Sequence, residues 1–392
     1  MARVICLTDQ DEYFGGGERM LLRVAAIARR HAATDLGVLW GRGGGIGAAE
    51  LSGFERIVRF NFPEPIGLRT WGAHRAAMRR LTGWAAEWRT TTLLAFTFRA
   101  AVRAAMIAVQ LNIPMAWMCQ QSDVLGAAFW RRPKGWMARR LLLRVQGEIV
   151  CINEAARWAF VAAGIPAARV HYIRNGVAVE HLAAAAMSAE QQQHWRATHR
   201  IPPGDLIVVC VARIDPNKQH DVLIEAVRAA NTMGVRVVLV CVGTPNPGLE
   251  SYESELRALT QRVGVAEQVV WPGRQSDVRD WLGMADVAVL ASREEAGPLA
   301  FAEAGAMGLP LIGTRVGGIP EIIVPGETGL LFESGDVQAC AAALVALARN
   351  PEQRRQLGRG AQALVRAHFN AALQDEAWAA LLQRLAMPRS AE

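Results

Sequence analysis

Short runs of apolar residues alternate with helix-like patterns along almost the whole chain. Such runs, rich in Val, Ile and Leu, are typical of strands that are buried on both faces of a parallel sheet. The order strand, helix, strand therefore predicts the α/β fold class. The predicted strands are Val4–Leu7, Leu36–Trp40, Thr92–Ala95, Met115–Met118 and Glu148–Ile152 in the first half, and Leu206–Ala212, Arg236–Val242, Gln268–Trp271, Val287–Leu290 and Pro310–Ile312 in the second.

The two series of strands indicate two Rossmann-like, doubly wound domains joined in tandem. Between them lie VHYIRNGV at 170–177, an Ala- and Gln-rich segment and a Pro-Pro-Gly turn, which place the hinge at 175–204. We expect an N-terminal domain over 1–180 and a C-terminal domain over 200–370. An amphipathic helix at about 371–386 is predicted to pack back on the first domain. Ligands of open α/β sheets bind at the carboxyl ends of the strands, so the site should lie in a cleft there.

Composition narrows the class of protein further. Of the 392 residues 52% are hydrophobic and 20% are charged, which excludes disordered and coiled-coil proteins. Four of the six cysteines lie inside apolar runs and none forms a CxxC pair, which favours buried thiols over metal ligands or disulfides. No apolar stretch reaches the ~18 residues needed to span a bilayer, and no secretory signal follows Met1. We therefore expect a cytoplasmic protein.

Charge is distributed unevenly along the chain. Residues 1–175 hold 24 Lys and Arg against 12 Asp and Glu, whereas the rest of the chain is mildly acidic. Cations next to tryptophans are suited to an anionic membrane surface. Solvated arginines beside core tryptophans are the alternative, and no motif supports nucleic acid as a partner. The residues concerned are Arg75, Arg79 and Arg80 near Trp71, Trp84 and Trp88, and Arg131, Arg132, Lys134, Arg139, Arg140 and Arg144 near Trp130 and Trp136.

A glycine cluster, Gly15–Gly17, follows the first predicted strand and precedes a helical pattern. Glycines let backbone N–H groups approach a ligand closely, and a helix N-terminus favours phosphate. A tight turn without a ligand is the alternative interpretation. A second glycine cluster, at 41–47, is not followed by a helical pattern, and we interpret it as a flexible loop.

Two cations follow the first strand of the second half. Arg213 ends that strand and Lys218 precedes an amphipathic helix, which predicts a clamp for an anion. A pair of solvated side chains is the alternative. A Schiff-base role for Lys218 is disfavoured because polar Gln219 and His220 follow it.

Two glutamates, Glu295 and Glu303, follow the strand at 287–290. Because Gly297-Pro298 interrupts the helical pattern, we place Glu295 in a loop and Glu303 in the first two turns of a helix that begins near Leu299. The N–H groups of Gly297 and Leu299 are then expected to be free for ligand oxygens. Carboxylates beside N–H donors suit a polyhydroxy ligand such as a sugar or a ribose, whereas a solvated acidic turn is the alternative.

In this order the motifs resemble family 4 of the retaining glycosyltransferases, which have the GT-B fold of two Rossmann-like domains facing a central cleft. The resemblance is strong over 205–336 and patchy over 10–178. The motifs that carry it are GGGER, HYIRNGV, the Arg213–Lys218 pair, the Glu295–Glu303 pair and the glycine-rich segment GLPLIGTRVGGIPEIIVPGETGLLFESGD.

The resemblance implies a nucleotide-diphosphate-sugar donor held mainly by the second domain. By matching position, Arg213 and Lys218 hold the diphosphate, Gly16 and Gly17 approach it from the first domain, and Glu303 accepts hydrogen bonds from the ribose hydroxyls. The acceptor is a carbohydrate or a lipid-linked molecule that binds mainly to the first domain.

The rest of the donor contacts follow from the same resemblance. Glu295 orients the sugar, helped by the backbone at Gly297, Pro298 and Leu299. Gly273 and Arg274 lie near the base. On the acceptor side the matching segment contains Gln121, Ser122 and Asp123.

The family chemistry implied here uses neither a cofactor nor a metal, and the nucleotide-sugar is a co-substrate. The acceptor attacks on the face from which the diphosphate departs and gives its proton to a phosphate oxygen, so positioning and charge stabilisation are what the protein supplies. Three departures from the family pattern concern the sugar: Gly297 replaces a common aromatic residue, the 117–123 segment has no His, and Ala178 replaces the usual Asp. At the first of these, Glu294 is the alternative to Glu295 for the contact with the sugar. A nucleotide-sugar epimerase, a phosphorylase and an inactive nucleotide-sugar-binding partner protein are the rival functions.

Overall fold

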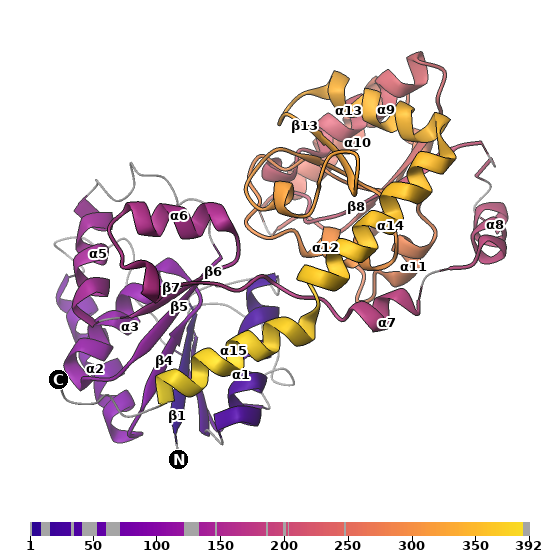
Figure 1. The fold of residues 1–392 in the computed structure, drawn as a ribbon. Helices are drawn as coiled ribbons and strands as arrows, with labels where there is room; N and C mark the ends of the chain where they lie inside the picture. Colours follow the sequence, from indigo (N-terminus) through magenta and orange to yellow (C-terminus); the bar gives the residue numbers. More distant parts are fainter. Residues whose placement is uncertain are drawn as a thin grey trace. The chain divides into compact units, whose positions relative to one another are not determined.

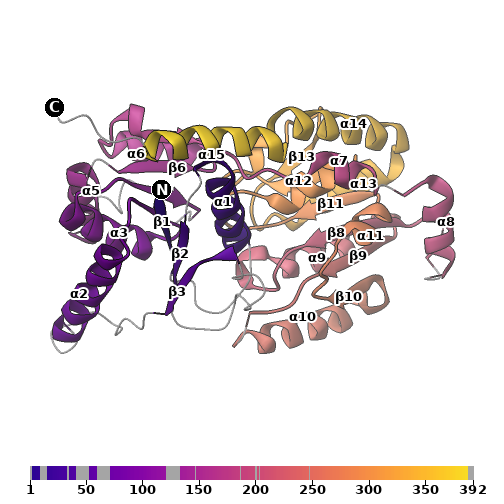
Figure 2. The same cartoon turned by 90° about the horizontal axis from the view of Figure 1, so that it is seen from below.

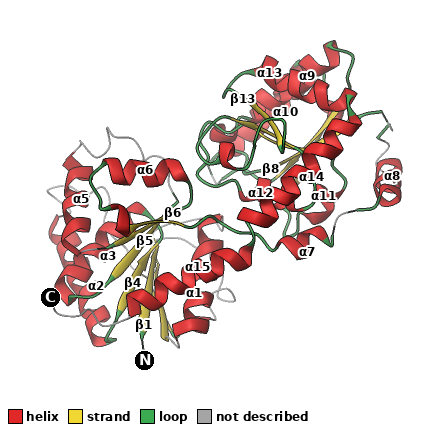
Figure 3. Ribbon diagram, viewed as in Figure 1, coloured by secondary structure: helices red, strands yellow, loops and turns green. Residues whose placement is uncertain are grey.

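The computed structural model describes residues 2–8, 16–32, 35–40, 53–59, 71–120, 133–145, 147–185, 187–198, 201–202, 204–246 and 248–386. The chain divides into two compact units, which are described separately. Unit 1 comprises Met1–Asn175 with Gln374–Glu392, and unit 2 comprises Gly176–Leu373. Each contains a parallel sheet with helices on both faces, as Figures 1 and 3 show, so the predicted fold class is confirmed.

Unit 1 contains a parallel sheet of seven strands in the order β3-β2-β1-β4-β5-β6-β7. Its strands are β1 (Arg3–Thr8), β2 (Asp35–Trp40), β3 (Arg56–Arg59), β4 (Thr92–Ala95), β5 (Met115–Cys119), β6 (Glu148–Cys151) and β7 (Val170–Tyr172). Its helices are α1 (Gly16–Ala32), α2 (Trp71–Glu87), α3 (Phe98–Leu111), α5 (Pro133–Val145), α6 (Glu154–Ala162) and most of α15 (Ala371–Ala386). The strand order reverses between β1 and β4, which is the topological switch point of this sheet.

Alternate residues of these strands are buried on opposite faces of the sheet. Ile5, Leu93 and Trp117 pack in one core with α2, α3, α5 and α6. Helices α1 and α15 lie on the other face, away from α2 and α3 (Figure 1). This two-sided burial explains why the strands read as continuous apolar runs in the sequence.

Helix α15 belongs mainly to unit 1, although the whole of unit 2 separates it from β7 in the sequence. Its Asp375 pairs with Arg23 of α1 at 2.6 Å and with Arg30 at 3.3 Å. Its Trp378 is fully buried. Next to it, the segments that cross between the units are hydrogen-bonded to each other, from Val177 N to Phe369 O and from Ala371 N to Val177 O, each at 2.8 Å.

Unit 2 contains a parallel sheet of six strands in the order β10-β9-β8-β11-β12-β13 (Figure 2). Its strands are β8 (Leu206–Val211), β9 (Val237–Val242), β10 (Val269–Gly273), β11 (Val287–Leu290), β12 (Leu311–Thr314) and β13 (Gly329–Phe332). Its helices are α7 (Val179–Ala183), α8 (Ala189–Thr198), α9 (His220–Thr232), α10 (Glu250–Arg262), α11 (Arg279–Gly283), α12 (Leu299–Ala306), α13 (Val337–Arg349) and α14 (Pro351–His368). The switch point lies between β8 and β11.

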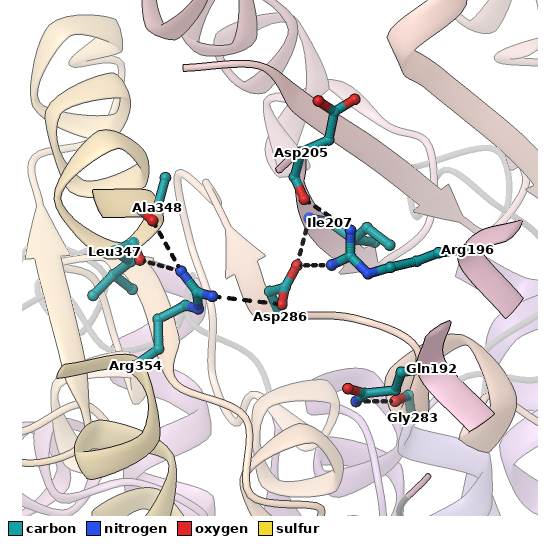
Figure 4. Close-up of polar contacts among 9 residues, drawn as sticks. All are labelled: Gln192, Arg196, Asp205, Ile207, Gly283, Asp286, Leu347, Ala348 and Arg354. Atoms are coloured by element: carbon teal, nitrogen blue, oxygen red, sulfur yellow. Dashed lines mark hydrogen bonds and ion pairs between the residues drawn. The ribbon is translucent and has the colours of Figure 1, made fainter. Parts of the chain in front are cut away.

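A polar network joins the amino ends of β8 and β11 to two helices (Figure 4). The carboxylate of Asp286, which precedes β11, accepts a hydrogen bond from Ile207 N at 2.9 Å and pairs with Arg196 of α8. Arg354 of α14 lies 3.9 Å from the same carboxylate and donates to Leu347 O at 2.6 Å. The network fixes one end of the sheet through polar contacts, and the other end is left for the candidate site.

Three strands were not predicted, and the structure corrects the expectation at each. They are β3, β7 and β13. Strand β3 is short and has an arginine at each end, β7 lies in the segment interpreted as a connector, and β13 begins at a glycine in a turn-rich motif. β3, β7 and β13 lie at edges of their sheets, where the apolar signal of a central strand is weakest.

Candidate functional site

Arg213, Lys218 and Glu295, three of the residues predicted to bind a donor, lie where β8 and β11 end. These strands are neighbours and parallel, so the loops Ala212–Gln219 and Ala291–Pro298 leave the same edge of the sheet side by side. This edge is the switch point, where ligands bind in open α/β sheets. The sequence assigned these loops to two separate motifs, and the fold brings them together.

An ion pair connects the two loops. Nζ of Lys218 lies 2.5 Å from Oε2 of Glu295, and the two side chains are only 13% and 15% exposed. Both side chains are thus largely buried, and little water screens the attraction between their charges. Sequence reasoning gave each residue a role but did not predict the contact; the one available signal was that both follow strands that meet at the switch point.

Asn217, the neighbour of Lys218, also joins the loops. Its Nδ2 donates to Glu294 O at 2.9 Å and its Oδ1 accepts from Glu294 N at 3.0 Å. Its carbonyl oxygen accepts from Arg293 N at 2.7 Å. The side-chain amide thus bonds both the C=O and the N–H of Glu294, as a residue of a neighbouring strand would. Sequence analysis did not single out this residue.

Arg213 points to a different partner from Lys218. Its Nη1 donates to Asn246 Oδ1, in the loop after β9, at 3.3 Å, and its Nη2 lies 3.6 Å from Asp215 Oδ2. The Arg213 side chain is 54% exposed, whereas that of Asp215 is buried. The two cations predicted as one clamp therefore start from the same loop, but Lys218 is largely buried in an ion pair and Arg213 is exposed.

Glycines allow the loops at this edge to approach closely. A Cβ on Gly317, which follows β12 and has φ +51°, would lie 1.8 Å from Glu295 O. The next residue, Gly318, donates its N–H to the same oxygen at 2.9 Å. Only glycine fits at 317, so the two glycines of TRVGGIPE hold the backbone of Glu295 in place.

Helix α12 begins at Leu299, as the interruption by Pro298 predicted. Glu303 lies in its second turn and is half-buried. The N–H of Leu299 is not free: it donates to Gly297 O at 2.9 Å, which corrects the expectation that it is open to a ligand. Pro298 provides no side-chain cap for this helix.

Behind the Lys218 loop lie two buried polar residues. Gln219 has the left-handed φ of +49°, and its amide donates to Ala291 O at 2.7 Å and accepts from Arg293 Nε at 3.1 Å. His220 is fully buried, and burial, together with the charge of Lys218, lowers its pKa to about 4. A neutral His220 therefore lies under the loop at physiological pH.

Gly273 and Arg274 lie at the end of β10, on the same edge of the sheet. Gly273 has φ +75°, and its carbonyl oxygen accepts from Gly243 N, after β9, at 3.0 Å. Arg274 is exposed. The two residues thus occupy the outer end of the row of loops that starts with Ala291–Pro298.

The predicted residues of unit 1 are only partly described. Gly16 and Gly17 form the start of α1. Gln121, Ser122 and Asp123 lie outside the described residues, as do the glycines at 41–47. Within the described ranges, no group of three or more His, Cys, Asp or Glu side chains is arranged to hold a metal ion.

Trp130, Arg131 and Arg132 lie outside the described residues, and three of the other predicted tryptophans differ in their surroundings. Trp84 and Trp88 stack at 5.8 Å, and Trp88 is 6% exposed, so this pair belongs to the core. Trp136 of α5 is 47% exposed and Arg140 lies 4.8 Å above its ring. All six cysteines are buried and free, as predicted. None of the helices that the structure describes is both long and apolar enough to cross a membrane.

Comparison with known proteins shows similarity over both halves of the chain. Residues 191–364 match the family model described as glycosyl transferases group 1, and residues 14–181 match the model of glycosyltransferase family 4. The fold is similar to that of Anabaena Alr3699/HepE in complex with UDP and glucose, with a TM-score of 0.81 over 98% of this chain and 100% of that one at 20% identity.

Two curated relatives are similar over part of the chain. N-acetyl-alpha-D-glucosaminyl L-malate synthase of Bacillus anthracis is 39% identical over 28% of this chain and 29% of its own length. D-inositol 3-phosphate glycosyltransferase of Streptosporangium roseum is 30% identical over 57% of this chain and 50% of its own length. The chain thus spans half or less of the length of these relatives. Since the two family models together match most of the chain, it belongs to the family 4 glycosyltransferases.

Proposed function

We propose that the chain is a retaining glycosyltransferase that takes a sugar from a nucleotide-diphosphate-sugar and transfers it to a hydroxyl of a carbohydrate or lipid-linked acceptor. The observation that carries the proposal is the Lys218–Glu295 pair at the switch point of unit 2. A cation for phosphate and a carboxylate for sugar hydroxyls lie side by side there. The complex of Alr3699/HepE with UDP and glucose supports a donor of this class.

In this proposal unit 2 binds the donor through residues from several strand ends. Lys218 and Arg213 neutralise the diphosphate as its charge grows in the transition state, which is where electrostatic stabilisation has the largest effect. Glu295 accepts hydrogen bonds from the sugar and Glu303 from the ribose. Gly273 and Arg274 lie near the base.

The remaining parts of the proposal concern unit 1 and the reaction path. Gly16 and Gly17, at the start of α1, approach the diphosphate, and Gln121, Ser122 and Asp123 belong to the acceptor side. The acceptor oxygen attacks the anomeric carbon on the face from which the diphosphate leaves, its proton passes to a phosphate oxygen, and the sugar keeps its anomeric configuration. Neither a protein nucleophile nor a metal takes part.

The decisive experiment offers the purified protein a panel of UDP-, GDP- and ADP-sugars, with and without EDTA, and follows release of nucleoside diphosphate. Release or transfer that EDTA does not affect, with retained configuration in the product, is the expected result. Conversion of the donor sugar without release of nucleotide would identify an epimerase. Binding of nucleotide without turnover of any sugar would identify the inactive partner protein.

A second part of the proposal is that unit 1 docks on anionic membranes at the cytoplasmic face, where a lipid-linked acceptor resides. It rests on the exposed side of α5, where Trp136 is 47% and Met137 64% exposed and Arg140 stacks on Trp136. A tryptophan beside a cation suits the lipid headgroup region. The guanidinium of Arg139, by contrast, lies against Gly164.

Co-sedimentation with neutral and anionic liposomes at low and high salt tests this docking. We expect binding to anionic lipid that salt weakens, and its loss when Arg140→Glu and Arg144→Glu are combined. Arg355→Glu on α14 of unit 2 is the control for net charge. Equal binding to neutral lipid, or none to anionic lipid, would indicate a soluble acceptor.

A further inference from the structure

We propose that Asn217 is a positioning residue that keeps Lys218 and Glu295 aligned for sugar transfer. The inference rests on the proposed function, because it assumes that Lys218 and Glu295 contact the donor. It goes beyond that function by assigning a role to a side chain that touches neither phosphate nor sugar in the proposal.

The contacts of Asn217 connect two loops that lie far apart in the sequence. Its side chain donates to Glu294 O at 2.9 Å and accepts from Glu294 N at 3.0 Å. Its carbonyl oxygen accepts a third hydrogen bond, from Arg293 N, at 2.7 Å. Lys218 follows Asn217 directly and Glu295 follows Glu294 directly. The three bonds therefore fix the backbone positions from which the two charged side chains start.

Other hydrogen bonds hold each of the two loops, Ala212–Gln219 and Ala291–Pro298, individually. Asp215 holds the first loop, because its Oδ1 accepts from Asn217 N and its carbonyl oxygen from Lys218 N, both at 2.9 Å. Gly318 holds the second loop by donating to Glu295 O at 2.9 Å. Asn217 contributes what these contacts do not, which is the position of one loop relative to the other.

The chemistry of an amide is required at this position. The C=O of Glu294 needs a donor and its N–H needs an acceptor, and only a primary amide of this length offers both. A carboxylate at 217 keeps the acceptor but brings a second oxygen to the Glu294 carbonyl oxygen. Asn217→Asp should therefore disturb the site as much as Asn217→Ala, although its size is that of asparagine.

The test measures donor turnover and nucleoside diphosphate affinity in both variants. Because misalignment affects the chemical step more than binding, we expect kcat to fall on the order of 10-fold while the Kd for nucleoside diphosphate changes less than about 3-fold. Gln192→Ala is the matched control, since the Gln192 amide also donates to a backbone carbonyl across two segments, at Gly283 (Figure 4). Gln192→Ala should keep the wild-type kcat, although its melting temperature should change by about as much as that of Asn217→Ala.

A double-variant comparison separates positioning from a general loss of structure. If Asn217 acts through Glu295, adding Asn217→Ala to Glu295→Ala should lower kcat by less than about 2-fold further. Undiminished kcat in both Asn217 variants, or a full 10-fold loss in the Glu295→Ala background, would overturn the inference. Failure of the proposed function looks different, because wild-type protein would then turn over no nucleotide-sugar and Lys218→Ala would leave nucleotide binding unchanged.

Discussion

Two helices of unit 1 begin differently from the two helices of unit 2 that follow the site loops. Elsewhere in unit 2, α13 and α14 are capped by the side chains of Asp336 and Asn350. In unit 1, α3 and α6 start directly after short turns, and each has a side-chain cap: Thr97 Oγ1 accepts from Ala100 N, and Asn153 Oδ1 accepts from Ala156 N. In unit 2, α9 and α12 start after the loops Ala212–Gln219 and Ala291–Pro298. Neither Gln219 nor Pro298 provides a side-chain cap.

The difference shows what each strand end is used for. A capping side chain satisfies a backbone N–H that the helix leaves unpaired, and it stabilises the fold. A helix that lacks such a cap keeps donors and partial positive charge at its start, which suits an anionic ligand. The capped ends of α3 and α6 therefore serve stability. We propose that the uncapped ends of α9 and α12 serve binding through their partial positive charge, since the N–H of Leu299 already donates to Gly297 O.

The largest effect should come from removing the cation beside the uncapped ends. Lys218→Ala should lower kcat on the order of 10²-fold, because it removes stabilisation of charge on the leaving diphosphate. Arg213→Ala should act in the same direction. Steady-state kinetics with the best donor of the panel is the measurement. A folded Lys218→Ala variant with wild-type kcat would contradict the proposal that the uncapped helix starts of unit 2 bind the donor.

The next effect concerns acid stability, and it comes from the buried histidine that opens α9. Burial lowers the pKa of His220 from its ordinary 6.5 to about 4. As pH falls through 6.5 the unfolded chain takes up a proton that the folded chain binds only near pH 4, so stability is lost with falling pH in that window. Between pH 7 and 5 we expect this group to cost about 2 kcal/mol.

Urea unfolding of the wild type and of His220→Phe at pH 7 and pH 5 measures this cost. The variant should lose less stability between the two pH values. An equal loss in both proteins would mean that His220 is not the group that senses acid.

The caps of unit 1 provide the complementary test. Thr97→Ala and Asn153→Ala should each lower the free energy of unfolding by about 1 kcal/mol. Neither should change kcat, since both caps serve the fold. A loss of activity with unchanged stability would show that unit 1 also uses these helix starts for binding.

The smallest expected effect concerns the ion pair between Lys218 and Glu295 in unit 2. Because Glu295 holds Lys218 in an ion pair, Glu295→Gln should release the cation and tighten binding of free nucleoside diphosphate roughly 3-fold, which is about 0.6 kcal/mol. Turnover of the sugar donor should fall in the same variant. Isothermal calorimetry that finds weaker binding would mean that Glu295 supports the nucleotide rather than competing for Lys218.

Much of this arrangement could be predicted from the sequence. The apolar runs identified the central strands, since strands buried on both faces contain few polar residues. Pro298 located the start of α12, because proline is tolerated before or at the first turn of a helix and not inside it. The order of the motifs indicated the family, which the two family models confirm.

The contacts within the site could not be predicted in the same way. Lys218 and Glu295 are 77 positions apart in the sequence, and no periodic pattern relates them. Asn217 is a polar residue in a loop. Its residue type alone does not tell whether its side chain connects two loops or is solvated. The bond from Leu299 N to Gly297 O depends on the turn geometry around Pro298, which residue types alone do not determine.

The return of α15 to unit 1 has a consequence for biosynthesis. During translation the residues of unit 2, Gly176–Leu373, are synthesised before Asp375 and Trp378. Unit 1 is begun first, but until α15 arrives it lacks a buried tryptophan and the partner of Arg23 and Arg30. Unit 1 therefore cannot be completed until the whole of unit 2 has been synthesised, and part of its apolar surface stays uncovered during that time.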